Sequence, residues 1–125
     1  MKNIGRDPES LLPLTPAVFH ILLALVDGER HGYGIMQEIA TRSEGKTRMG
    51  PGTLYGSIKR MLGDGLIEES GVRPDPDLDD ERRRYYKLTN FGLRVTQAEA
   101  RRLAQLVNVA HAKHLVFGPE PIGGA

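Results

Sequence analysis

The side chains best suited to chemistry in this sequence recur on one side of residues 51–66, which read as an amphipathic helix. Stepping about 100° per residue gathers the apolar side chains on one arc: Leu54, Ile58, Met61 and Leu62. The opposite arc carries Thr53, Gly56, Lys59 and Arg60, with Tyr55 at its border. Small, hydroxyl and cationic side chains suit a helix that enters the major groove of DNA. The alternative is an ordinary surface helix with a solvated polar face.

A second group of cations lies in residues 82–87, which contain four Arg or Lys residues and no acid. In a strand, Arg83, Tyr85 and Lys87 would share one face, and Arg84, Tyr86 and Leu88 the other. We expect the Tyr86 face to pack on helices and the other face to meet phosphate, because Lys and Arg supply most non-specific affinity for DNA. One alternative is that the arginines pair with the five acids of residues 75–81. Another is a mixed interpretation, in which the basic strand meets DNA and this acidic segment holds it off non-specific DNA.

Start and stop signals predict the elements that position these groups. Thr15 and Pro16 begin a helix that is apolar around much of its circumference and ends near Val26. Further helices are predicted for residues 32–41 and 51–62, followed by strands at 66–70 and 82–88 around a loop at 71–81. Thr89 or Asn90 caps a last helix that ends near Leu115. Residues 1–13 are expected to form a loose arm and residues 118–125 a flexible tail.

This order predicts a mainly α fold with a small β-hairpin, a winged helix-turn-helix over residues 14–89. Residues 90–117 would then form a C-terminal dimerisation helix with an apolar stripe of Leu103, Leu106, Val107 and Ala110. Pairing with a second copy would bury this stripe, and the two-fold symmetry would match a palindromic operator. The alternative is that the stripe packs back on the first helix.

Composition sets broad limits on the class of protein. The 125 residues carry a formal net charge of +1 and contain no Cys, which leaves no disulfides or thiolate metal sites. The longest apolar run, Ile21–Val26, is too short to span a bilayer, and the N-terminus lacks the layout of a signal peptide. We therefore expect a cytoplasmic protein without a membrane partner.

Two other motifs point weakly to other chemistry. Residues 40–47 resemble a phosphate-binding loop, but a helical pattern precedes them where a strand is required, and Pro51 follows where a helix should continue. His111 and His114 are three residues apart on a predicted helix, but a zinc site needs three or four ligands. We predict no enzyme activity, no cofactor and no metal.

The chain resembles the PadR-like transcriptional regulators. The resemblance covers residues 14–115, and the matching motifs are His31-Gly-Tyr-Gly-Ile35, Gly52-Thr-Leu-Tyr55, Lys59-Arg60, Gly65-Leu-Ile67 and Arg84-Tyr-Tyr-Lys-Leu-Thr89. It implies a homodimeric winged-helix protein that binds double-stranded DNA, acts as a repressor and responds to a small-molecule effector. It also implies a set of DNA-contacting residues: Thr53, Tyr55, Lys59 and Arg60 in the third helix, and Arg83, Arg84 and Tyr85 in the wing. Tyr33 would either touch phosphate or pack inside. A winged-helix module that binds other proteins instead of DNA is the alternative function.

Overall fold

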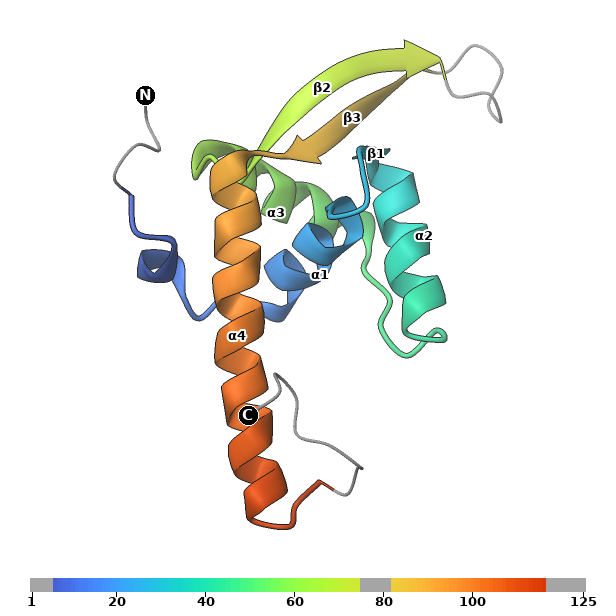
Figure 1. The fold of residues 1–125 in the computed structure, drawn as a ribbon. Coiled ribbons are helices and arrows are strands. Elements are labelled where there is room, and N and C mark those ends of the chain that lie inside the picture. Colours follow the sequence, from blue (N-terminus) through green and yellow to red (C-terminus); the bar gives the residue numbers. More distant parts are fainter. Residues whose placement is uncertain (1–5, 75–81, 117–125) are drawn as a thin grey trace.

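The computed structural model describes residues 6–74 and 82–116. Their elements follow one another along the chain as η1 (Pro8–Leu11), α1 (Pro16–Leu25), β1 (Arg30–His31), α2 (Gly32–Arg42), α3 (Pro51–Gly63), β2 (Ile67–Pro74), β3 (Arg82–Leu88) and α4 (Asn90–Ala112). Figure 1 shows the β2–β3 hairpin lying across the top of the helices, with α4 descending on one side. The architecture is a winged helix-turn-helix with one additional long helix, which confirms the predicted fold class.

Side-chain caps explain where the first and last helices begin. The hydroxyl of Thr15 accepts a hydrogen bond from the Val18 N–H at 3.2 Å, and Pro16 occupies the first helical position. The hydroxyl of Thr89 accepts a hydrogen bond from the Gly92 N–H at 2.9 Å. Both starts are therefore the ones predicted, whereas α4 ends at Ala112, three residues before the predicted end.

The sheet has three antiparallel strands in the order β1-β3-β2. Strand β1 was not predicted, because it consists of two residues that pair only with β3, far away in the sequence. Strand β2 continues to Pro74, so the prediction of a loop from Gly71 was wrong for residues 71–74. A bulge between Glu69 and Gly71 shifts the register of β2 against β3 and lets the strand continue past Gly71. The acidic segment 75–81 lies outside the described residues.

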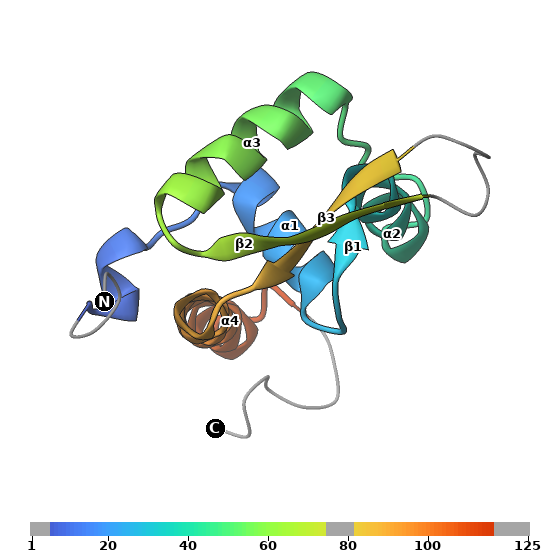
Figure 2. The ribbon, with the colours of Figure 1, turned by 90° about the horizontal axis from the view of Figure 1, so that it is seen from above.

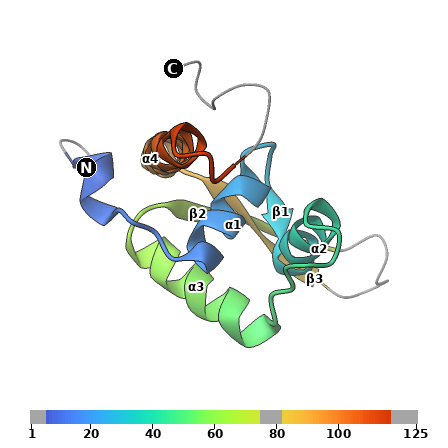
Figure 3. The ribbon, with the colours of Figure 1, turned by 90° about the horizontal axis from the view of Figure 1, so that it is seen from below.

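Helix α1 occupies the centre of the molecule. Figures 2 and 3 show the strands crossing above it, with α3 along one side and α4 along the other. It contacts α2, α3, α4 and β3, as expected for a helix that is apolar on several sides. The core around it consists of buried side chains from every α-helix and all but the shortest strand, among them Ile21, Leu22, Ile35, Ile39, Leu54, Ile58, Leu66, Ile67, Tyr86, Phe91 and Val95.

The N-terminal segment for which we expected a loose arm packs on the folded domain from Arg6 onward. The 3-10 helix η1 lies beside α4, and Leu11, Leu12 and Leu14 contact the core. Arg6 donates a hydrogen bond to the Asp64 carbonyl at the end of α3 (2.7 Å), and its guanidinium lies 4.3 Å from the centroid of the Phe91 ring. Residues 6–14 thus pack against both the end of α3 and the side of α4.

Helix α4 is part of the core only in its first half. Its buried residues end at Glu99, and from Ala100 to Ala112 its side chains are exposed or half-buried. Figure 1 shows this second half extending below the other elements. Within residues 6–74 and 82–116, no helix combines the length and apolarity that crossing a membrane requires. The predicted tail at 118–125 lies outside the described residues.

Candidate nucleic-acid interface

Helix α3 presents the predicted polar arc to solvent. Thr53, Lys59 and Arg60 are exposed, whereas Leu54, Ile58 and Met61 are at most 2% exposed. The separation of the two arcs was therefore predicted correctly for these six side chains. Among the described residues, none forms a hydrogen bond or ion pair with Lys59. The charge of its ammonium group is therefore available to a ligand.

The predicted apolar arc was wrong at one position. Leu62 is 38% exposed, and Ser57 is buried in its place, with its hydroxyl accepting a hydrogen bond from Arg60 at 3.4 Å. The reason is geometric: the buried arc is centred close to Leu54, and Leu62 lies about 80° away from it at the border of the helix face. The small Ser57 side chain is what fits on the opposite border, where α3 approaches the core.

Tyr55 lies at the border of the polar arc, as predicted, and is 47% exposed. Its ring is packed against Gly32 at the start of α2. A β-carbon at Gly32 would lie 2.8 Å from the Tyr55 Cζ atom, which is too close for two carbon atoms. Gly32 therefore makes room for the Tyr55 ring, and the ring in turn fixes where the start of α2 meets α3.

Tyr33 and Arg83 come together from different elements. Tyr33, in the first turn of α2, is 47% exposed, and the Arg83 guanidinium carbon on β3 lies 5.2 Å from its ring centroid. This contact places the start of α2 beside the wing. Tyr33 is thus a surface residue, which answers the question that the sequence left open between an exposed and a packed position.

Strand β3 divides its side chains between two faces as predicted. Tyr86 is 5% exposed and Leu88 packs against the core, while Tyr85 and Lys87 lie on the other face. We call this second side of the sheet, with Arg73, Arg83, Tyr85 and Lys87, the outer face. Tyr85 is half-buried there, because Arg73 covers its ring at 3.9 Å and His31 meets its edge at 5.2 Å. Its ring is therefore largely occupied by contacts within the protein.

Arg84 lies on the opposite side of the sheet from Arg83. It forms an ion pair with Glu69 of β2 at 3.3 Å and remains exposed. The predicted wing cations are thus split between two surfaces. Pairing of the arginines with residues 75–81 lies outside the described residues.

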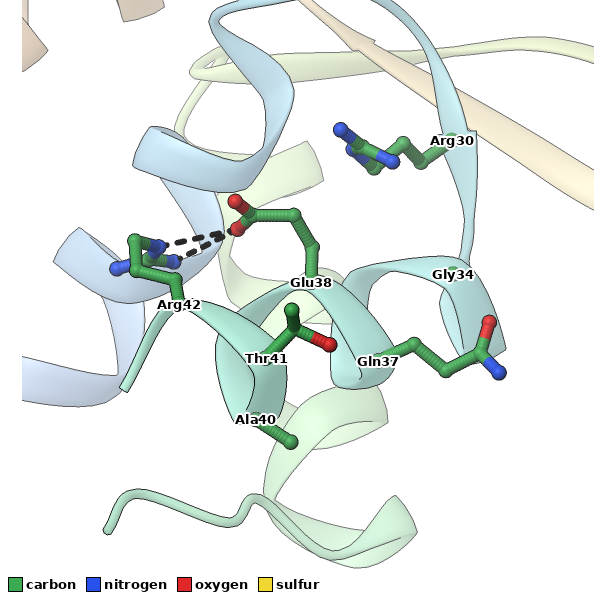
Figure 4. Close-up of a pocket in the computed structure, with 7 residues that line it drawn as sticks. All are labelled: Arg30, Gly34, Gln37, Glu38, Ala40, Thr41 and Arg42. Carbon is green, nitrogen blue, oxygen red and sulfur yellow. Dashed lines mark hydrogen bonds and ion pairs between the residues drawn. The ribbon is translucent and has the colours of Figure 1, made fainter. Parts of the chain in front are cut away.

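Arg42 is directed away from this surface. Figure 4 shows it beside Glu38 at a shallow pocket of about 600 Å³ lined by Arg30, Gly34, Gln37, Glu38, Ala40, Thr41 and Arg42. Its guanidinium pairs with Glu38 at 3.0 Å and donates to the His20 carbonyl at 3.1 Å. Arg42 consequently holds α2 to α1 instead of adding to the charge beside α3. Residues 40–42 belong to α2, so a helix and not a strand precedes the phosphate-loop-like residues that follow.

The predicted dimerisation residues lie on the second half of α4. Leu106 is 55% exposed, and Leu103, Val107 and Ala110 are half-buried. Val109 and Leu115, which the sequence analysis left out of the stripe, are 51% and 72% exposed. Within the described part of the chain, no three His, Cys, Asp or Glu side chains come together as metal ligands would.

A network on the outer face was missed by the sequence analysis. Glu29, just before β1, pairs with Arg73 of β2 at 2.6 Å and accepts a hydrogen bond from the Ser70 hydroxyl at 2.6 Å. The Arg73 hydrogen bond first, and the Ser70 hydrogen bond second, lower the pKa of Glu29 to about 2. These residues are 41 and 44 positions apart, and Arg73 stood in the predicted loop, so only the strand pairing could have linked them.

Known proteins with similar sequences point to one family. The model of the transcriptional regulator PadR-like family matches residues 21–98. The transcriptional regulator Rv3488 of Mycobacterium tuberculosis is 33% identical over 87 residues, which cover 70% of this chain and 75% of that protein. An uncharacterised 37.1 kDa protein in a transposon of Streptomyces fradiae is 36% identical over 89 residues, covering 69% of this chain but only 22% of that protein.

Solved structures share the fold. A PadR family transcription regulator from Clostridium difficile superimposes with a TM-score of 0.66 at 23% identity, over 78% of this chain and 97% of that one. A PadR-like transcriptional regulator from Bacillus cereus gives a TM-score of 0.65 at 17% identity, over 87% of this chain and 96% of that one.

Proposed function

This chain belongs to the PadR-like family of transcriptional regulators, which are not enzymes, and from that premise we propose that it binds double-stranded DNA as a homodimer. The observation that carries the proposal is the exposed face of α3, where Thr53, Lys59 and Arg60 lie on a helix anchored by buried apolar residues. Such a helix can enter the major groove without losing its contacts to the core.

Residues from two neighbouring elements support this role for α3. Tyr33 and Arg83 lie together where α2 meets the wing, and Tyr55 lies between α3 and the start of α2. We propose that these side chains contact the DNA backbone on either side of the groove that α3 enters, with Tyr85 and Arg84 at the edge of the interface. Phosphate contacts of this kind fix the register of a protein on the duplex.

The second half of α4 supports the homodimer. Leu106 and Val109 are large apolar side chains with about half of their surface exposed, on a helix that extends beyond its own domain. A second copy packed against Leu103, Leu106, Val107 and Ala110 would cover this stripe. Two recognition helices related by a two-fold axis would then read a palindromic operator.

The test measures binding to duplex DNA from upstream of the protein's own gene by fluorescence anisotropy. The double variant Lys59→Ala/Arg60→Ala should lose about 100-fold or more in affinity, and the slope of log affinity against log salt should fall by about two. The control variant Arg101→Ala/Lys113→Ala removes the same charge from an exposed position of α4 and from the exposed residue that follows the helix. Equal affinity of the α3 variant and the wild type would contradict the proposed role of α3.

A protein-interaction module is the second candidate function. The ion pairs Glu29–Arg73 and Arg84–Glu69 favour it, because they neutralise wing cations that would otherwise attract phosphate. Under this candidate, the wild type would bind neither the upstream duplex nor random duplex DNA at low salt. The same anisotropy experiment therefore separates the two functions.

We further propose that the protein is a repressor in the cytoplasm and that a small molecule releases it from DNA, as the family resemblance implies. Selection of bound sequences from random duplex DNA, with and without candidate aromatic ligands, tests the operator and the effector together. A palindromic selected sequence supports the homodimer. If the same sequences are selected equally well with and without ligand, the proposed effector is contradicted.

A further inference from the structure

The outer face of the wing carries a cation that the proposed DNA interface does not use. Arg73 of β2 is the cross-strand partner of Arg83 on β3, so the two side chains share one face. Directly opposed residues have β-carbons about 5 Å apart. Strand pairing therefore places Arg73 beside Arg83, which we propose contacts the DNA backbone.

Two like charges at opposed positions destabilise a hairpin unless other groups offset them. Each guanidinium here lies over its own aromatic ring, Arg83 over Tyr33 and Arg73 over Tyr85, at 5.2 and 3.9 Å. Arg73 has a further partner, because the Glu29 carboxylate pairs with its Nη1 atom at 2.6 Å. The ring holds the guanidinium plane in place whichever anion it pairs with.

The Glu29–Arg73 pair is open to solvent. The Arg73 side chain is 43% exposed and that of Glu29 is 37% exposed, so another anion can reach the guanidinium without rearrangement of the core. Glu29 is ionised at neutral pH, since hydrogen bonds from Arg73 and Ser70 lower its pKa to about 2. Ser70 gives the carboxylate a second fixed contact at 2.6 Å, which would remain if Arg73 were withdrawn.

We propose that Glu29 occupies the place of a DNA phosphate on Arg73, and that on binding a backbone phosphate of the duplex replaces the Glu29 carboxylate. A carboxylate and a phosphate each offer guanidinium a pair of anionic oxygens that accept its N–H groups, so one can exchange for the other on a guanidinium packed on Tyr85. Arg73 then contributes one phosphate contact beside Arg83. This inference rests on the proposed DNA binding.

A purely structural role for Glu29 predicts the opposite result. If Glu29 only braces the wing, its removal loosens the hairpin and weakens DNA binding. If it competes with phosphate, its removal strengthens binding, because Arg73 no longer has to give up a partner. The sign of the change in affinity therefore distinguishes the two roles.

The experiment is a double-mutant cycle of Glu29→Gln and Arg73→Gln in the full chain, measured by anisotropy on one duplex at several salt concentrations. Glu29→Gln should tighten binding about two- to five-fold with an unchanged salt slope, matching the strength of an exposed ion pair. Arg73→Gln should weaken binding and reduce the salt slope by about 0.9, the value for one phosphate contact. In the Arg73→Gln background, the effect of Glu29→Gln should fall to the general effect of removing one negative charge.

Glu68→Gln is the matched control for the general effect of removing a negative charge. Glu68 is exposed and lies opposite Lys87 on the same two strands. Its effect should be the same with and without Arg73, whereas the effect of Glu29→Gln should shrink to that of Glu68→Gln when Arg73 is replaced. Melting curves followed by circular dichroism show whether each variant is folded.

Weaker binding by a folded Glu29→Gln variant, or an equal effect of Glu29→Gln with and without Arg73, would overturn the proposal. These outcomes differ from failure of the proposed function. In that case the wild type itself would bind no duplex, and Lys59→Ala/Arg60→Ala would change nothing.

Discussion

Glu99 shows how much a single buried charge can organise in this small domain. Its carboxylate is almost fully buried on α4, accepts a hydrogen bond from the Leu14 N–H at 2.9 Å and pairs with Arg102 at 2.5 Å. It thereby ties the N-terminal segment to α4. The hydrogen bond from Arg102, with a smaller part from the Leu14 N–H, lowers the pKa of Glu99 in the folded protein, although burial opposes this.

We expect Glu99→Gln to lower the free energy of unfolding by about 1.5–3 kcal/mol at pH 7, the usual range for a hydrogen bond to a charged group. A carboxyl group whose pKa is lower in the folded state stabilises the protein above its unfolded pKa of about 4.3. That contribution disappears as the pH falls through the folded-state pKa. Urea unfolding of wild type and variant should therefore show a large difference at pH 7 that shrinks below pH 4.

Glu9→Gln is the control for this experiment, because Glu9 is an exposed carboxylate of the same N-terminal segment. It should change stability little at either pH. A difference between wild type and Glu99→Gln that stays constant from pH 7 to pH 3 would show that the charge of Glu99 contributes nothing.

At the scale of the elements, the junction of α4 with the start of β2 is set by one close approach of backbone to backbone. A β-carbon at Gly92 would overlap the carbonyl oxygen of Leu66 and would lie 2.8 Å from its carbonyl carbon. The same carbonyl accepts a hydrogen bond from the Thr89 N–H at 3.1 Å, and the Thr89 hydroxyl donates to the neighbouring Gly65 carbonyl at 2.6 Å. Helix α4 can start where it does only because residue 92 has no side chain.

Gly92→Ala should consequently destabilise the protein by about 1–3 kcal/mol or more, since neither backbone can yield to the added methyl group. Gly56→Ala is the matched control, because Gly56 lies inside α3 with nothing within 4 Å of an added β-carbon. It should stabilise the protein by about 0.5–1 kcal/mol through helix propensity alone. Thermal or urea unfolding of the two variants measures both effects, and equal stabilities would refute the close approach.

The sequence predicted elements that rest on local signals and missed those that rest on distant contacts. Thr15 and Thr89 marked two helix starts correctly, because a cap acts on its own next few residues. Strand β1 has no local signal at all and exists through its pairing with Tyr85 and Tyr86. Similarly, Leu62 lies at the border of its helix face, where the shape of the partner surface decides burial.

The features of the candidate site also differ in whether local sequence signals could predict them. The exposed arc of α3 followed from helical periodicity, and the two faces of β3 followed from strand alternation. The covering of Tyr85 by Arg73 and the pairing of Arg73 with Glu29 depend on the sheet order and on the bulge in β2. Neither can be obtained from spacing along the chain.

At the scale of the whole molecule, the shape separates the surface proposed for DNA from the surface proposed for pairing. The second half of α4, with its stripe of apolar side chains, extends away from the helices that surround α1 (Figure 1). Pairing there leaves α3 and the wing uncovered. The proposed homodimer therefore places its interface and its DNA surface on different parts of the chain.

Leu106→Glu should convert the proposed dimer to a monomer. A two-fold interface contains the substituted residue twice, and each Leu contributes about 1.5–3 kcal/mol when buried, so the dimer should weaken by about 100-fold or more. Light scattering over a range of concentrations measures the mass, with Gln105→Glu as the control on the neighbouring exposed position. A wild type that remains monomeric at every concentration would rule out the homodimer.

The bulge in β2 decides which side chains of the strand lie on the outer face. Because Ser70 is the extra residue, Val72 opposes Arg84 on one side of the sheet and Arg73 opposes Arg83 on the other. If the strand ran without the bulge and Ser70 took a place in the regular pairing, every later residue would change sides, which turns Val72 outward and Arg73 inward. Deleting Ser70 would leave both residues on their present sides, so the bulge absorbs one extra residue without exchanging the two surfaces of the strand.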